Sequence, residues 1–144
     1  MSRSSLYAIR ALTYLACQAP GKLSGTRDIA RHEGIPAAFL GKVLQQLRRG
    51  RLLRAYRGTG GGYELALPPE KITLLAVLRC MDGASGLDSC VLEERDCSYN
   101  NPCALHNSWG PVQARLLEFF ESNTLAELVA ARQSEARRSA LHRE

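Results

Sequence analysis

The sequence predicts a mainly α-helical fold, in which a winged helix-turn-helix domain with a small β-hairpin wing precedes a long dimerisation helix. Three observations predict it. Two short helical segments meet at Gly34, a glycine-rich turn at residues 58–62 separates two strand-like segments, and a strongly apolar helical segment follows residue 108. The first two features are typical of a helix-turn-helix with a wing, and the third is typical of a helix that pairs with a second copy.

The first helix is predicted from Ser4 to a stop at residues 20–21, where proline and glycine follow each other. Its apolar side chains recur close to helical spacing: Leu6, Ile9, Leu12 and Leu15. A second, short helix is expected to begin after Ser24 or Thr26, either of which can cap it. It is expected to end at Gly34, because glycine readily adopts the left-handed conformation that follows many helices.

A third helix is predicted to open at Pro36, whose missing N–H costs nothing in a first turn. One apolar stripe runs along it: Leu40, Val43, Leu44 and Leu47. Residues 52–56 and 63–67 are then predicted to form two short strands around the glycine turn. A hairpin in this place predicts the wing.

The second half of the chain is predicted to be helical apart from one loop. Residues 72–81 form an apolar helical pattern, whereas residues 82–107 show no period and contain three of the five cysteines. Thr124 and Glu127 form a capping-box pattern for a last helix. We therefore expect four parts: a winged helix-turn-helix domain (1–82), a cysteine sensor loop (83–107), the dimerisation and C-terminal helices (108–136) and a charged tail (137–144).

Charge is distributed unevenly between the two halves of the chain. Residues 1–70 carry 11 Lys and Arg against 4 Asp and Glu, and residues 71–144 carry 8 against 10. A basic half joined to a slightly acidic half suggests a polyanion partner, although a basic surface also keeps proteins soluble. No run of 18 apolar residues is present, so we expect no membrane span and a cytoplasmic protein.

Double-stranded DNA is the polyanion that we expect. Residues 41–60 carry six basic side chains and no acidic one, and this cluster coincides with the predicted third helix and wing. A solvated basic face is the alternative. Gly41 suits close approach of DNA to the third helix. The predicted DNA-binding residues are Ala37, Ala38, Lys42, Gln45, Arg48, Arg49, Arg54, Arg57 and Thr59, with Arg57 at the wing tip, where it can enter a minor groove.

The cysteine loop contains the other candidate site. Cys90, Cys97, Cys103 and His106 are separated by six, five and two residues. Three thiolates with a nearby imidazole can bind an iron–sulfur cluster or zinc, act as a thiol switch, or remain unliganded. The two other cysteines, Cys17 and Cys80, are expected in the core.

An enzyme is not expected. The glycine turn at residues 58–62 lacks the Lys-Ser/Thr pair and the following helix of a phosphate-binding loop. Nor does the sequence offer a nucleophile with a base and an orienting residue.

The chain resembles the bacterial winged-helix regulators of the IscR and NsrR type over about residues 3–130. The resemblance rests on residues 6–12, Ile29-Ala30, the Arg-Gly-x-Gly-Gly-Gly-Tyr run of the wing (57–63, continuing to 66), residues 72–74, the cysteine loop and Trp109. It implies a homodimer with a long crossing helix, and a cluster held by Cys90, Cys97, Cys103 and a fourth ligand.

The resemblance also implies which fourth ligand to expect. In IscR-like members it is a histidine at the position of His106, and in NsrR-like members an aspartate near the start of the first helix. Residues 1–27 contain no acidic residue and no histidine, which favours His106, with Glu93, Glu94 and Asp96 as fallbacks.

The sequence therefore predicts a transcriptional regulator, a repressor by expectation, that binds operator DNA under the control of an iron–sulfur cluster. The signal is nitric oxide, oxygen, iron or redox state. The alternative is a clusterless thiol- or zinc-dependent dimeric regulator or structural DNA-binding module. Four apolar side chains are predicted at the dimer interface, because they exceed what one small domain can cover: Val112, Leu116, Phe119 and Phe120.

Overall fold

The computed structural model describes residues 2–83, 100 and 102–143. The elements in these ranges are α1 (Arg3–Ala16), α2 (Thr26–Glu33), α3 (Ala37–Arg49), β1 (Leu53–Tyr56), β2 (Gly62–Leu65), the 3₁₀ turn η1 (Pro69–Lys71), α4 (Leu74–Asp82), α5 (His106–Ser122) and α6 (Leu125–Leu141). The fold is therefore the predicted one: mainly helical, with a two-stranded antiparallel hairpin.

Helices α2 and α3 form the helix-turn-helix. Gly34 ends α2 with φ 65° and ψ 38°, the left-handed conformation expected for it. The prediction that Ser24 or Thr26 caps α2 was wrong, because Gly25 is the N-cap and provides no side-chain bond. Ser24 instead pairs through its backbone with Tyr63 of β2, so this stretch of chain is extended.

The backbone pairing of Ser24 with Tyr63 attaches the wing to the body. Leu53 of β1 lies opposite Leu65, and Tyr56 opposite Gly62. The backbone N–H of Ser24 donates to the Tyr63 carbonyl at 3.1 Å, and the Tyr63 N–H donates to the Ser24 carbonyl at 2.8 Å. These bonds make Ser24 a short third partner of the hairpin and fix the base of the wing.

The core lies between α1, α2, α3 and α4 and closes on the first residue of α6. The predicted apolar stripe of α3 is buried throughout, as are Leu12 and Leu15 of α1 and Leu125 of α6. Leu6 is exposed instead. Cys17 is also exposed, so its prediction as a core residue was wrong; it follows the last turn of α1, beyond the packed face. Cys80 is half-buried and packs against the core.

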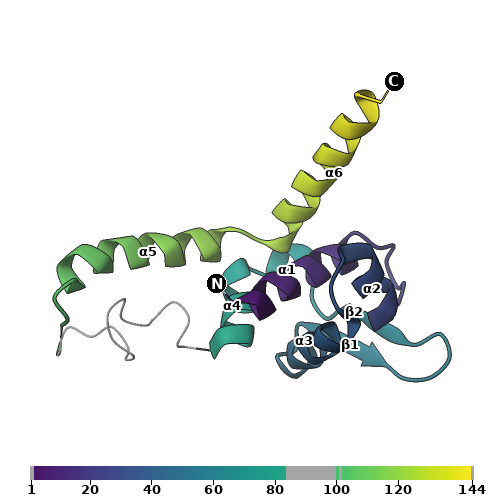
Figure 1. Ribbon diagram of the computed structural model, residues 1–144, viewed down its shortest axis with the longest axis horizontal. Helices are drawn as coiled ribbons and strands as arrows, with labels where there is room; N and C mark the ends of the chain where they lie inside the picture. The colour runs from purple at the N-terminus through teal and green to yellow at the C-terminus, as the bar shows by residue number, and fades with distance from the viewer. Residues whose placement is uncertain (1, 84–99, 101, 144) are drawn as a thin grey trace.

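Helices α5 and α6 extend from the body in different directions (Figure 1). Helix α5 begins at His106 rather than at Ser108. The capping residue Glu127 accepts a bond from the Thr124 N–H at 3.3 Å, as predicted. Helix α6 continues to Leu141, so most of the expected charged tail is helical. None of the helices in the described ranges is both long and apolar enough to span a membrane.

Candidate nucleic-acid interface

Helix α3 presents one polar face to solvent. Its buried side holds Leu40, Val43, Leu44 and Leu47. The exposed residues include the six predicted DNA contacts of the helix: Ala37, Ala38, Lys42, Gln45, Arg48 and Arg49. A side chain added at Gly41 would meet open space, so this glycine leaves a gap on the α3 surface. The face therefore has two small residues at its start and longer hydrogen-bonding side chains beyond them.

A shallow cleft of about 230 Å³ separates α3 from the wing. It brings together three of the predicted contacts, Gln45 and Arg48 from α3 and Arg57 from the turn. Its other lining residues are Ala55, Tyr56, Gly62 and Tyr63. Two guanidinium groups, an amide and two tyrosines make this cleft suitable for a phosphodiester group.

The other basic residues differ in whether they already form hydrogen bonds or ion pairs within the chain. Arg54 donates to the Ala66 carbonyl at 3.0 Å and lies 3.9 Å from the Glu64 carboxylate. By contrast, Lys42, Arg48, Arg49 and Arg57 form no ion pair within the part of the chain that the structure describes. Arg49 and Thr59 are exposed. Arg54 is therefore the least available of the predicted contacts.

The described part of the cysteine site lies at the start of α5. Cys103 is half-buried, His106 is buried, and the His106 N–H donates to the Cys103 carbonyl at 3.1 Å. This turn places a thiol and an imidazole three residues apart, and both groups are common ligands of iron and zinc. Cys90, Cys97 and the fallback residues Glu93, Glu94 and Asp96 lie outside the described residues. Within those residues, no group of three or more candidate ligands is found.

The last turn of α4, which precedes the cysteine segment, is bonded to α3. The Gln46 side-chain amide donates to the carbonyls of Cys80 at 3.1 Å and Met81 at 3.2 Å. The Cys80 thiol in turn lies 3.6 Å from the Gln46 carbonyl, and burial raises the pKa of this thiol. These contacts link the end of α4 directly to the predicted recognition helix.

The same turn is bonded to the start of α1. The hydroxyls of Ser2 and Ser5 donate to the Asp82 carboxylate at 2.5 Å and 2.7 Å. Burial raises the pKa of Asp82, but the bonds from these two serines outweigh it and hold that pKa below its ordinary value. Sequence patterns gave no signal for Gln46 or Asp82, because both act through contacts between elements that are distant in the chain.

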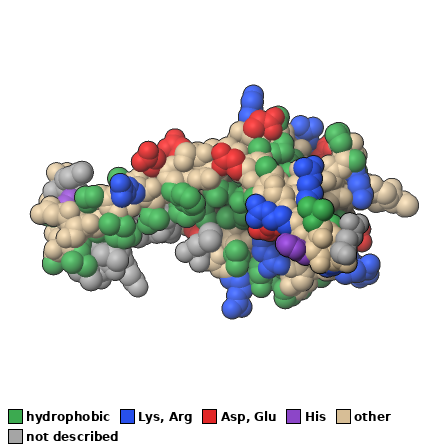
Figure 2. All heavy atoms as spheres, turned by 90° about the horizontal axis from the view of Figure 1, so that it is seen from above, with side chains coloured by type: hydrophobic (Ala, Val, Ile, Leu, Met, Phe, Trp, Pro, Cys, Tyr) green, Lys and Arg blue, Asp and Glu red, His purple; other side chains and the backbone are tan. Residues whose placement is uncertain are grey.

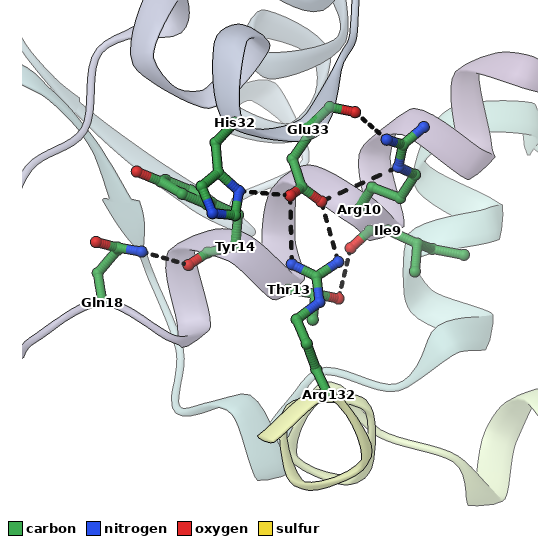
Figure 3. A network of polar contacts seen from close by, with 8 residues as sticks. All are labelled: Ile9, Arg10, Thr13, Tyr14, Gln18, His32, Glu33 and Arg132. Carbon is green, nitrogen blue, oxygen red and sulfur yellow. Dashed lines mark hydrogen bonds and ion pairs between the residues drawn. The ribbon is translucent and has the colours of Figure 1, made fainter. Parts of the chain in front are cut away.

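A buried carboxylate at the end of α2 was also missed (Figure 3). The Glu33 carboxylate accepts hydrogen bonds from the Arg132 guanidinium of α6 at 3.0 Å and 3.4 Å. The His32 ring nitrogen lies 2.8 Å from the same carboxylate, and the Arg10 guanidinium of α1 lies 4.0 Å from it. The His32 ring also packs against the Tyr14 ring, with centroids 4.7 Å apart and planes tilted by 51°. Glu33 is four residues after the buried Ile29, and this spacing was the available signal that it faces inward.

Helix α5 carries an uncovered apolar face. Val112, Leu116 and Phe119 are 49, 36 and 54% exposed, whereas Phe120 is half-buried against the core. Figure 2 shows hydrophobic side chains along the arm that α5 forms. A row of large exposed apolar side chains is unusual for a monomer. Three of the four predicted interface residues are thus accessible, and Phe120 packs within its own subunit.

Residues 1–131 match the family model Rrf2, which is described as an iron-dependent transcriptional regulator. The chain belongs to the Rrf2 family. The match covers the helix-turn-helix, the wing, the cysteine segment, α5 and the first part of α6. Transcriptional regulation through a winged helix-turn-helix, a non-enzymatic function, is therefore the activity of this Rrf2-family chain.

Relatives with assigned names agree. An HTH-type transcriptional regulator of Mycobacterium tuberculosis (strain H37Rv) is 41% identical over 131 residues, which cover 89% of this chain and 80% of the relative. The HTH-type transcriptional regulator IscR of Yersinia pestis (biovar Antiqua, strain Angola) is 31% identical over 123 residues, which cover 85% of this chain and 74% of the relative.

Solved structures share the fold. CymR, the global cysteine regulator of Bacillus subtilis, superposes with a TM-score of 0.77 at 21% identity and covers 91% of this chain and 96% of its own. IscR of T. potens superposes with a TM-score of 0.70 at 24% identity, covering 91% of this chain and 86% of its own.

Proposed function

We propose that this Rrf2-family regulator is a homodimeric repressor whose affinity for operator DNA depends on an iron–sulfur cluster that senses nitric oxide, oxygen, iron or redox state. The observation that carries the proposal is the position of the Cys103–His106 turn. It begins α5, the helix with the exposed apolar face, and the cysteine segment before it starts at the end of α4, which is bonded to α3. A structural change in that segment can therefore act on the predicted DNA contacts through α4 and on the predicted dimer contacts through α5.

In this proposal α3 enters the major groove, where Lys42 and Gln45 hydrogen-bond to base edges. Arg48 and Arg49 contact the phosphate backbone, which gives affinity but little sequence information. Arg57 and Thr59 at the wing turn contact the neighbouring minor groove. The cleft between α3 and the wing accommodates the phosphate that lies between the two grooves.

The apolar face of α5 supplies the dimer contact. Val112, Leu116 and Phe119 lie at spacings of four and three residues, so they form one stripe along the helix. Pairing this stripe with its equivalent in a second copy removes it from water and places two helix-turn-helix units on one DNA duplex.

Cys90, Cys97 and Cys103 would hold the cluster, with His106 as fourth ligand. The donor chemistry of the described pair fits, since a thiolate and an imidazole are both iron ligands and the His106 N–H bond to the Cys103 carbonyl holds their turn in place. An iron–sulfur cluster, when bound, supplies redox chemistry and reactivity toward small oxidants. The chain's own contribution is to order the segment around its ligands and to transmit that order through the end of α4 to Gln46 of α3.

The rival within this family is a clusterless thiol- or zinc-dependent regulator. A structure with this fold supports the alternative. It is the crystal structure of an oxidised form of CymR from Staphylococcus aureus, which superposes with a TM-score of 0.70 at 22% identity. In that case the same cysteines respond to oxidation or hold zinc, and the DNA-binding surface is unchanged.

Anaerobically purified protein separates the two. We expect a visible absorption band, with iron and acid-labile sulfide in proportion to the protein. Cys97→Ala should abolish the band, whereas His106→Ala should weaken or shift it, because a carboxylate or water can replace the imidazole. Colourless wild-type protein without iron would contradict the cluster and leave the thiol or zinc alternative, which a zinc assay then decides.

A further inference from the structure

Glu33 stands where the DNA-binding motif meets the C-terminal helix. It is the last residue of α2, directly before the Gly34 turn that leads to α3. Its side chain is 6% exposed, yet it receives Arg132 from α6, a residue 99 positions later in the chain. The two Arg132 nitrogens approach both carboxylate oxygens, which is the fork geometry that makes an arginine pair directional as well as attractive (Figure 3).

The start of α6 is held by backbone hydrogen bonds. The Leu74 N–H donates to the Asn123 carbonyl at 2.9 Å, and the Leu125 N–H donates to the Ile72 carbonyl at 3.0 Å. These bonds fix the junction of α5 and α6 beside the start of α4. Within the described residues, polar contacts join the body to the α5–α6 unit at two places, this junction and the Arg132–Glu33 pair near the middle of α6. Phe120 and Leu128 add apolar contacts with the core.

The second attachment combines an apolar contact with the ion pair. A groove of about 270 Å³ runs between α1 and α6 beside the pair. Ile9 and Thr13 line it from α1, and Leu128 and Ala131 from α6. Ile9 and Leu128 are partly buried against the core at this groove. Apolar contacts are not directional, so the Arg132 fork adds the directional restraint at this attachment.

We propose that the Arg132–Glu33 pair sets the angle of the helix-turn-helix relative to α5, and thereby the half-site spacing that the dimer accepts. The inference rests on the proposed dimerisation through α5. If two copies pair there, the distance between their α3 helices depends on how each helix-turn-helix is held on its own α5–α6 unit. A change of that angle moves the two recognition helices along the duplex, and half-site spacing follows the distance between them. Arg132 and Glu33 are then positioning residues that touch no DNA themselves.

The network makes the proposal testable without unfolding the protein. When Arg132 is removed, Arg10 and His32 still lie beside Glu33, so its buried carboxylate keeps partners. Arg132→Gln removes the charge and the fork, and Arg132→Lys keeps the charge but not the fork. Arg138→Gln is the matched control: it removes an equal charge from the same helix, at an exposed residue with no ion pair in the described part of the chain.

The probe is a palindromic duplex selected by the wild-type protein from a randomised library, together with versions lengthened or shortened by one or two base pairs at the centre. We expect wild type and Arg138→Gln to lose at least about tenfold in affinity when the spacing changes by one pair, a factor equivalent to about 1.4 kcal/mol. Arg132→Gln should lose only about threefold or less, and Arg132→Lys should fall between the two. Thermal unfolding of each variant is measured beside the DNA titration.

The spacing profiles of these variants can overturn the proposal. If Arg132→Gln keeps the wild-type spacing profile, the pair only stabilises the fold, whatever its effect on the melting temperature. If Arg138→Gln flattens the profile equally, the effect is one of charge and not of position. Should Arg132→Gln fail to fold, an unchanged profile for Arg132→Lys would decide against the proposal. A wild-type protein that binds its selected duplex as a monomer would instead refute the proposed dimer, and with it any spacing for the pair to set.

Discussion

Replacement of Gly62 by alanine tests how the wing is held. A Cβ at this position would lie 2.7 Å from the Ser24 carbonyl oxygen, 2.8 Å from the Ser24 carbonyl carbon and 3.1 Å from its nitrogen. These are backbone atoms, so no side chain can rotate away. Gly62 also has φ 149°, a conformation that residues with a Cβ rarely adopt. The start of β2 must therefore move away from Ser24 in this variant.

The expected cost follows from what that movement breaks. Two backbone hydrogen bonds join Ser24 and Tyr63, and each contributes about 1 kcal/mol to the free energy of unfolding. The unfavourable φ adds about 1 kcal/mol. Gly62→Ala should thus lower the free energy of unfolding by about 3 kcal/mol.

Gly60→Ala is the control for this experiment. Gly60 lies in the same turn with φ 80°, but a Cβ there meets nothing within 4 Å, so only the conformational cost of about 1 kcal/mol applies. Both substitutions restrict the unfolded chain equally. Urea denaturation followed by circular dichroism should place Gly62→Ala about 2 kcal/mol below Gly60→Ala, and DNA affinity should fall with it. Equal stabilities within about 0.5 kcal/mol would mean that the close approach of Ser24 to Gly62 does not determine the cost.

Three further predictions concern the DNA surface, the dimer and acid stability. Arg57→Ala should weaken operator binding by about 1 to 3 kcal/mol and reduce the slope of affinity against salt, whereas an unchanged slope would remove Arg57 from the DNA. Phe119→Asp should sediment as a monomer that binds DNA poorly; a dimer would mean that α5 packs elsewhere. The folded pKa of Asp82 is below its unfolded value, so its stabilising effect is present above about pH 4 and is lost as pH falls through the folded pKa. Asp82→Asn should remove that loss from a series of melting temperatures between about pH 3 and 7, and an identical acid limb in both proteins would contradict it.

Much of the fold was predictable because it depends on local rules. The apolar stripe of α3, the left-handed Gly34 and the glycine turn of the wing each follow from spacing or backbone conformation within a few residues. The same rules failed at Ser24, where pairing with Tyr63 overrides capping, and at Cys17, which follows the last turn of α1. Tertiary hydrogen bonds are not encoded in local patterns.

The candidate DNA surface was predictable for a similar reason, since basic residues on one helix face and one turn are visible in the sequence. The residues that hold this surface in place were not predictable. Arg132 and Glu33 are far apart in the chain, and neither Gln46 nor Asp82 belongs to a recurring motif. These residues become visible when the helices are placed against one another, because their roles come from polar atoms that meet across elements.

One titration tests whether the metal state controls DNA affinity. The selected duplex is titrated by fluorescence anisotropy with one anaerobic preparation, before and after a chelator removes its iron, with Cys97→Ala carried through the same treatment. We expect the wild-type affinity to change by at least about tenfold while that of Cys97→Ala stays constant. Wild-type protein that contains iron and binds the duplex equally well in both states would contradict it.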